Sequence, residues 1–139
     1  MSIVKTMLAT LALGTVALSA PAFADKMKAT LNAASEVPPN ASPATGTADI
    51  DFDPATKKVS WKLTYTGLTG PATMAHFHGP AEPGKNAGVA VPIAPASSPS
   101  EGSATLTDAQ AADLVAGKYY VNVHTDANKG GEIRGQVTK

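Results

Sequence analysis

Apolar and polar residues alternate with a period of two along much of the chain, which is the pattern of a half-buried β-strand. The clearest example is a pair of segments, residues 47–53 and 59–66, joined by a turn that contains Asp53 and Pro54. The apolar positions of the two segments are Ala48, Ile50, Phe52, Val59, Trp61, Leu63 and Tyr65. Because residues two apart share one face of a strand, each segment has one apolar and one polar face. We therefore predict an antiparallel hairpin that packs one side on a core.

Further strands are predicted where short alternating or β-branched runs lie between glycine, proline and serine residues. They fall near residues 27–32, 72–78, 88–94, 101–106, 118–124 and 131–138. Pro92 lacks a backbone N–H, so the strand that contains it is expected to be an edge strand or to carry a bulge.

One short helix is predicted over residues 109–116. Thr107 and Gln110 have the spacing of a capping box, and Gly117 is a typical stop residue. About eight strands with a single helix predict an all-β fold, an antiparallel Greek-key β-sandwich or barrel.

The first 24 residues have the pattern of a cleaved secretory signal peptide. Lys5 supplies the positive charge, residues 7–18 are mainly apolar, and Ala22-Phe23-Ala24 is a small-x-small cleavage site. The apolar run is shorter than a membrane-spanning helix needs, although a retained N-terminal anchor is the alternative. We therefore expect a periplasmic or secreted protein, of which residues 25–139 form one domain with no membrane attachment after cleavage.

Charge and cysteine content narrow the classes of function. The chain has 11 basic and 11 acidic residues and no basic cluster, which argues against nucleic-acid binding. It has no cysteine, so it can form neither a disulfide framework nor a thiolate metal site. Any metal must be held by histidine, methionine, carboxylate or backbone groups.

The three histidines of the chain occur in two of the predicted strands. His76 and His78 are two apart, so they share a face with Met74, while Phe77 points to the core. His124 follows Val123 and is likewise on the face opposite the core. If the two strands are neighbours, three imidazoles meet on the outer face of the sheet, where loops can cover them. The alternative is that the histidines only hold loops at the end of the sheet through hydrogen bonds.

The identity of the ligands favours copper. Three histidines without cysteine suit zinc or copper, and the thioether of Met74 shifts the choice toward copper because soft ligands favour Cu(I). We predict a metal site of Met74, His76, His78 and His124. Met27 is a weaker alternative ligand.

For several polar residues near these strands, the sequence allows more than one role. Glu132 is the most plausible carboxylate to complete the site, Glu82 lies in the loop after His78, and Asp126 is a possible hydrogen-bond partner for His124. Glu132 and Arg134 either belong to a solvated strand face or form an internal ion pair, or one of them braces the loop after His124. The first interpretation, a solvated face or an ion pair, is favoured. Asn122 is expected to brace a loop.

Four ordered blocks of sequence carry a family likeness. They are Glu36-Val37-Pro38-Pro39, Ala75-His76-Phe77-His78-Gly79-Pro80, Tyr120-Val121-Asn122-Val123-His124-Thr125 and Gly131-Glu132-Ile133-Arg134-Gly135-Gln136. Over about residues 26–138 the chain resembles the CHRD domain, which takes its name from chordin. The resemblance implies an extracytoplasmic β-sandwich. In chordin such domains belong to an extracellular growth-factor antagonist, and bacterial members are mostly stand-alone exported proteins.

The arrangement of histidines is also similar to that of copper–zinc superoxide dismutase, which uses a His-x-His pair on a strand and a later histidine. This chain lacks that family's bridging histidine, zinc ligands and cysteine pair. The likeness favours a copper site and argues against dismutation.

Three hypotheses follow. The first is a periplasmic protein that stores, buffers or delivers copper, and its partner could be another periplasmic copper protein or a second copy of the chain. The second is a metal-free protein-interaction module. The third, a small copper redox enzyme or a zinc hydrolase, is least favoured because no nucleophile stands beside a base in the sequence.

Overall fold

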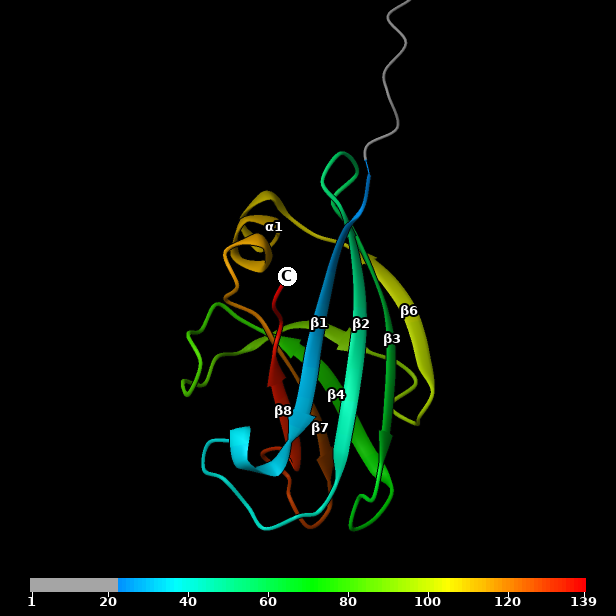
Figure 1. Ribbon diagram of the computed structural model, residues 1–139, viewed down its shortest axis with the longest axis vertical. Helices are drawn as coiled ribbons and strands as arrows, with labels where there is room; N and C mark the ends of the chain where they lie inside the picture. Colours follow the sequence, from blue (N-terminus) through cyan, green and yellow to red (C-terminus); the bar gives the residue numbers. More distant parts are fainter. Residues whose placement is uncertain (1–22) are drawn as a thin grey trace, which may run out of the picture.

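The computed structural model describes residues 23–139 (Figure 1). The predicted signal peptide, residues 1–24, lies almost entirely outside the described residues. The first strand, β1 (Asp25–Asn32), begins directly after the predicted cleavage site. Between residues 23 and 139, no helix is both long enough and apolar enough to cross a membrane.

The described residues form an all-β fold with one short α-helix, which confirms the predicted fold class. After β1 come η1 (Ala33–Ser35, a 3-10 helix), β2 (Thr45–Asp53), β3 (Lys58–Thr66), β4 (Ala72–His78), β5 (Val89–Ile93), β6 (Ser100–Thr105), α1 (Asp108–Val115), β7 (Tyr120–Thr125) and β8 (Ile133–Gln136). The last strand is shorter than the predicted 131–138, although Thr138 still makes an isolated bridge to Lys28.

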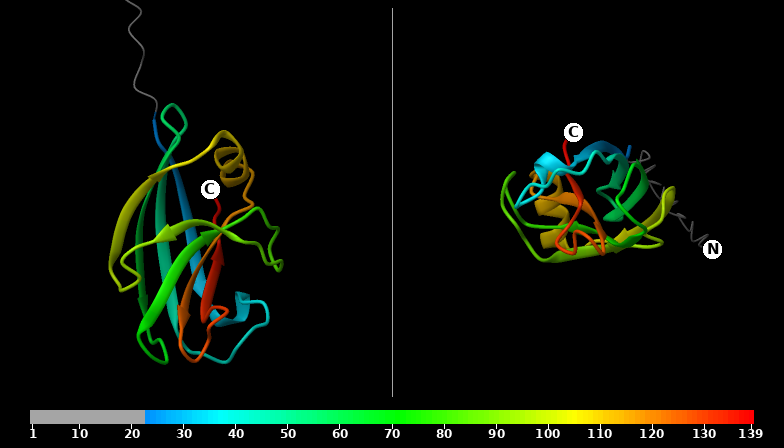
Figure 2. Two further views of the ribbon diagram at one scale, coloured as in Figure 1. Left: turned by 180° about the vertical axis from the view of Figure 1, so that it is seen from behind. Right: turned by 90° about the horizontal axis from the view of Figure 1, so that it is seen from below.

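All eight strands belong to one antiparallel sheet, in the order β5-β4-β7-β8-β1-β2-β3-β6. The order joins strands that are distant in sequence, β4 with β7 and β3 with β6, as in the predicted Greek-key arrangement and unlike a simple meander. The sheet curls so that its two edge strands, β5 and β6, come into contact. Viewed along its long axis, the molecule is a nearly closed barrel (Figure 2).

The barrel interior is filled by the apolar faces of the strands. The β2–β3 hairpin has the predicted pattern, since Ile50, Phe52, Val59 and Leu63 are all buried. From β3, Trp61 reaches Phe77 of β4 in an edge-to-face contact with ring centroids 5.4 Å apart. This contact between distant strands fixes the inner face of β4 and therefore its outer face as well.

The helix and the edge strand also match their sequence signals. The Thr107 side chain accepts a hydrogen bond from the Gln110 N–H, and the Gln110 side chain accepts one from the Thr107 N–H. Pro92 lies in β5 at the edge of the sheet, opposite His76, and the β4–β5 register shifts between Phe77 and His78.

Two loops cover the outer face of β7 and β8, so every residue of β7 is buried. Asn86, in the loop between β4 and β5, donates a hydrogen bond to the Val37 carbonyl, and Arg134 of β8 donates one to the Asn86 side chain. Asn40, in the loop after η1, donates to the Glu132 carbonyl. The loops therefore bury the polar side chains that β7 and β8 carry on the outer face of the barrel.

Candidate metal centre

The β4 strand places two histidines on its outer face. Phe77 and Ala75 are buried in the core, so His76 and His78, which alternate with them, point away from it. His78 is only 8 % exposed because the loop after β4 folds over it. His76 is half-buried and forms the open side of the site.

The β7 strand places the third histidine beside them. β4 and β7 pair antiparallel, with Met74 opposite His124, His76 opposite Asn122 and His78 opposite Tyr120. Residues opposite each other in a ladder share a face, so His124 lies on the same outer face as the β4 histidines. The expectation that the two strands are neighbours is confirmed.

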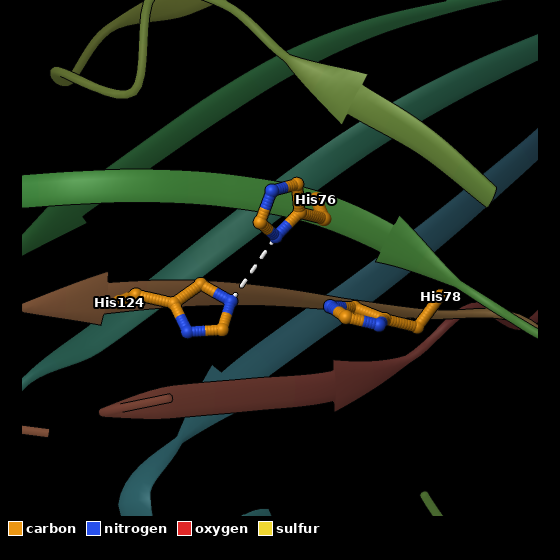
Figure 3. A group of neighbouring side chains, drawn as sticks. All are labelled: His76, His78 and His124. Carbon is orange, nitrogen blue, oxygen red and sulfur yellow. Dashed lines mark hydrogen bonds between the residues drawn. The ribbon is translucent and has the colours of Figure 1, made fainter. Parts of the chain in front are cut away.

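The three imidazoles converge on one point. Each histidine offers one ring nitrogen, and these nitrogens all lie within 4.8 Å of one another. His76 Nδ1 is 3.1 Å from His124 Nε2, as the dashed line in Figure 3 marks. Nitrogen ligands of one ion at about 2.0–2.1 Å lie roughly 3.3–3.6 Å apart, so small side-chain movements would bring the three onto a shared metal. Within residues 23–139, this is the one group of histidine and acidic side chains arranged in this way.

A backbone carbonyl fixes the proton on the His124 ring. His124 Nδ1 donates to the Lys129 carbonyl at 2.8 Å, so in the neutral ring Nε2 keeps its lone pair. His78 differs, because Nδ1 lies 3.0 Å from the Ala87 carbonyl and Nε2 lies 2.9 Å from Asn122 Oδ1, and a neutral ring can donate to only one of these two oxygens. Metal-binding histidines are commonly oriented by such a bond from the other ring nitrogen.

The neutral form of the rings is favoured. Burial lowers the pKa of His76, and the neighbouring His124 and His78 lower it further. Burial also lowers the pKa of His78, although its hydrogen bonds to Ala87 and Asn122 act in the opposite direction. Neutral imidazole is the form that binds a metal.

An aromatic ring supports the inner end of the site. The Tyr120 ring stacks on His78, with centroids 4.8 Å apart and planes at 6°. The Arg134 guanidinium lies over the same Tyr120 ring, 3.4 Å from its centroid. Arg134 is buried and also donates to the Lys85 carbonyl, so it fixes the loop after β4 rather than the loop after His124. The interpretation of Glu132 and Arg134 as a solvated face is wrong for both residues.

The two candidate methionines differ in position. Met74 is 49 % exposed and lies across the ladder from His124, so it remains a predicted fourth ligand at the open side of the site. Met27 is 5 % exposed and belongs to the barrel core. The prediction of Met27 as an alternative ligand is therefore wrong, because Met27 lies on the inner face of the sheet and the histidines lie on the outer face.

The three candidate carboxylates lie outside the histidine group. Glu132 is fully buried, and its carboxylate accepts hydrogen bonds from the Thr69 N–H and hydroxyl and from the Asn128 side chain. It therefore braces the loop after His124, which was the less favoured of the two interpretations of this residue. Glu82 is exposed in its loop, and so is Asp126. The prediction that Asp126 is the hydrogen-bond partner of His124 is wrong, because His124 Nδ1 bonds to the Lys129 carbonyl instead.

Two residues near the histidines have contacts that the sequence did not reveal. Asn122 Oδ1 is 2.9 Å from His78 Nε2, and its Nδ2 is 3.4 Å from the Gly130 carbonyl. Asn122 therefore braces a loop, as predicted, but it also contacts His78, one of the candidate metal ligands. Glu36 is 4 % exposed and lies beside Asn122 and Gly131. Its place in the block Glu36-Val37-Pro38-Pro39 was a family signal, but nothing in the local sequence shows that its loop folds over β7.

Comparison with known proteins gives one match. The CHRD domain matches residues 27–137, which include all eight strands except the first two residues of β1. No curated protein and no solved structure matched the chain. The match covers most of the chain and includes the three histidines, so the protein belongs to the CHRD domain family.

Proposed function

We propose that this protein is a periplasmic copper-binding protein that stores, buffers or delivers the metal. One copper ion is held by His76, His78 and His124, with Met74 as the fourth ligand. The protein is not proposed to be an enzyme.

The observation that carries the proposal is the convergence of three ring nitrogens within 4.8 Å on a partly covered face. His124 donates Nδ1–H to the Lys129 carbonyl, and the Ala87 carbonyl lies 3.0 Å from His78 Nδ1. Histidines that only hold loops in place would have no reason to bring their remaining nitrogens together. Three charged rings at this distance would repel one another, whereas three neutral rings can bind one metal ion together.

The chemistry of the ligands favours copper over zinc. No carboxylate belongs to the group within residues 23–139, and the chain has no cysteine. Imidazole suits both metals, but copper binds more tightly than zinc in the affinity order of divalent ions, and a thioether suits Cu(I). Met74 supplies such a thioether at the open side of the site.

The family suits a protein that acts outside the cytoplasm. CHRD domains occur in extracellular proteins. The chain has no cysteine, so the proposed site has no thiol that an oxidising compartment could oxidise. This supports the periplasm as the compartment, together with the signal peptide pattern of residues 1–24.

A titration of residues 25–139 with Cu(I) and Cu(II), against a competing chromogenic chelator, tests the proposal. We expect one copper per chain and loss of most of the affinity in His76→Ala, His78→Ala and His124→Ala. Unchanged affinity in the His76→Ala/His78→Ala double variant would overturn it. Equal thermal stability with copper and with a chelator would instead favour a metal-free interaction module, because a ligand of the native state raises its stability.

A further inference from the structure

A buried carboxyl group beside Asn122 has one oxygen without a hydrogen-bond partner in the described residues. Glu36 is 4 % exposed, and its Oε1 has no hydrogen-bond partner of normal geometry among the described residues. Burial raises its pKa to about 7, against the opposing effects of Arg134 and Asn122. An uncompensated buried acceptor costs free energy, so a partner in another state of the site would explain why it is there.

The Asn122 amide lies beside the Glu36 carboxyl group. Both side chains flank Gly131, where an added Cβ would be 2.3 Å from Glu36 Oε1 and 2.6 Å from Asn122 Nδ2. The bond that now holds Asn122 Nδ2, to the Gly130 carbonyl, is long at 3.4 Å. A short rotation of the amide can therefore exchange this weak bond for a hydrogen bond to Glu36 Oε1.

At its other end, the same amide occupies the nitrogen of His78 that a metal needs. His78 Nδ1 lies 3.0 Å from the Ala87 carbonyl and Nε2 lies 2.9 Å from Asn122 Oδ1. Both oxygens can only accept, so the neutral ring donates to one of them at a time. A ring nitrogen has one bonding direction, so Nε2 cannot hold Asn122 and a metal ion at the same time. Binding a metal through Nε2 therefore requires Asn122 to move.

We propose that Asn122 and Glu36 are positioning residues of the metal site. While the site is empty, Asn122 Oδ1 accepts a hydrogen bond from His78 Nε2–H. When Nε2 binds a metal, the ring proton is on Nδ1 and faces the Ala87 carbonyl, and the Asn122 amide turns its Nδ2 to Glu36 Oε1. The inference rests on the proposed function. The exchange of Gly130 for Glu36 keeps Asn122 Nδ2 hydrogen-bonded in both states, so the movement leaves no buried donor unpaired.

Nuclear magnetic resonance of the wild-type protein tests the movement directly. The side-chain amide of Asn122 and the ring nitrogens of His78 are observed before and after anaerobic addition of Cu(I), which is diamagnetic. We expect a downfield shift of the Asn122 amide protons on loading, together with a changed His78 Nε2 resonance. An Asn122 amide signal that is the same in both states would overturn the proposal.

Variants test the role of Glu36. In Glu36→Leu, which removes the acceptor, Cu(I) affinity is expected to fall about tenfold or more, the usual effect of losing a group that orients a ligand. Glu36→Gln keeps an oxygen and should retain most of the affinity, and Glu82→Leu, which removes an exposed carboxylate, should retain all of it.

The outcomes separate this inference from the proposed function. Wild-type affinity in Glu36→Leu would overturn the role of Glu36 and leave the copper site intact. Failure of the wild-type protein to bind Cu(I) would overturn the copper site, and this inference with it. If Glu36→Leu does not fold, the resonance experiment on the wild-type protein decides.

Discussion

At the scale of single residues, the candidate site depends on which atom of each histidine is already engaged. The bond from His124 to the Lys129 carbonyl uses Nδ1 and leaves Nε2 with its lone pair, whereas both ring nitrogens of His78 face acceptor oxygens, one of Ala87 and one of Asn122. His76 differs, since its Nδ1 faces His124 and its ring is more exposed. The sequence predicted which face these histidines share. It did not predict which ring nitrogens form hydrogen bonds, because the Ala87 and Lys129 carbonyls belong to loops.

Met74 provides the first prediction at this scale. Its thioether contributes only to a soft ion, so Met74→Leu should weaken Cu(I) binding by about tenfold, or about 1.4 kcal/mol, and leave Zn(II) binding unchanged. Competition titrations with both ions measure this. Met27→Leu is the matched control, since Met27 lies in the core, and it should change stability by less than about 1.5 kcal/mol with no effect on either affinity. Equal losses for both metals in Met74→Leu would rule out a thioether ligand.

The histidines also predict a pH dependence. The pKa values of His76 and His78 are below the ordinary 6.5 in the folded protein, so the unfolded chain binds more protons just below pH 6.5. Their contribution to the free energy of unfolding is therefore present above pH 6.5 and is lost as the pH falls through the lowered values.

Denaturant unfolding of the metal-free protein between pH 7.5 and 5 checks this sign. The stability of wild type minus that of His76→Gln/His78→Gln should fall on acidification, and the raised pKa of Glu36 cancels because both proteins contain it. A difference that rises on acidification would show that the histidines are stabilised in their charged form.

At the scale of elements, the strands and the helix were predictable because their signals are local. Alternation in residues 47–53 and 59–66 and the capping box at Thr107 each depend on neighbours in the sequence, and the structure confirms them. The loops were not predictable in the same way. The loop that contains Glu36 folds over β7 through contacts with residues about 90 positions away, such as the bond from Asn40 to Glu132.

Gly131 gives a prediction at this scale, since it connects the loop after β7 to β8. Its φ of +129° is a conformation that side chains rarely adopt, and an added Cβ would collide with Glu36 and Asn122. Gly131→Ala should cost about 1–3 kcal/mol of stability and weaken copper binding, although every ligand is kept.

Gly130→Ala is the matched control for that substitution. An added Cβ at Gly130 meets nothing within 4 Å, so its stability should stay within about 1 kcal/mol of wild type and its copper affinity should not change. Denaturant unfolding and a copper titration of both variants decide the question. Equal behaviour of the two variants would show that the packing around Glu36 and Asn122 does not support the site.

At the scale of the whole molecule, the barrel brings the site together by pairing β4 with β7, which are separated by β5, β6 and α1 in the sequence. The alternating pattern fixed the outer face of each strand, but the pairing between strands is a property of the complete sheet. The same closure places Met27 inside and Met74 outside, although both occur in predicted strands.

The central claim is that His76, His78 and His124 hold one copper ion together. X-ray absorption spectroscopy of the Cu(I)-loaded protein tests it most directly, because imidazole ligands give a distinct multiple-scattering signal. We predict about three imidazole nitrogens near 2.0–2.1 Å with one sulfur, and fewer imidazoles in each single histidine variant. A spectrum without imidazole scattering, or one that is unchanged in all three variants, would contradict the account.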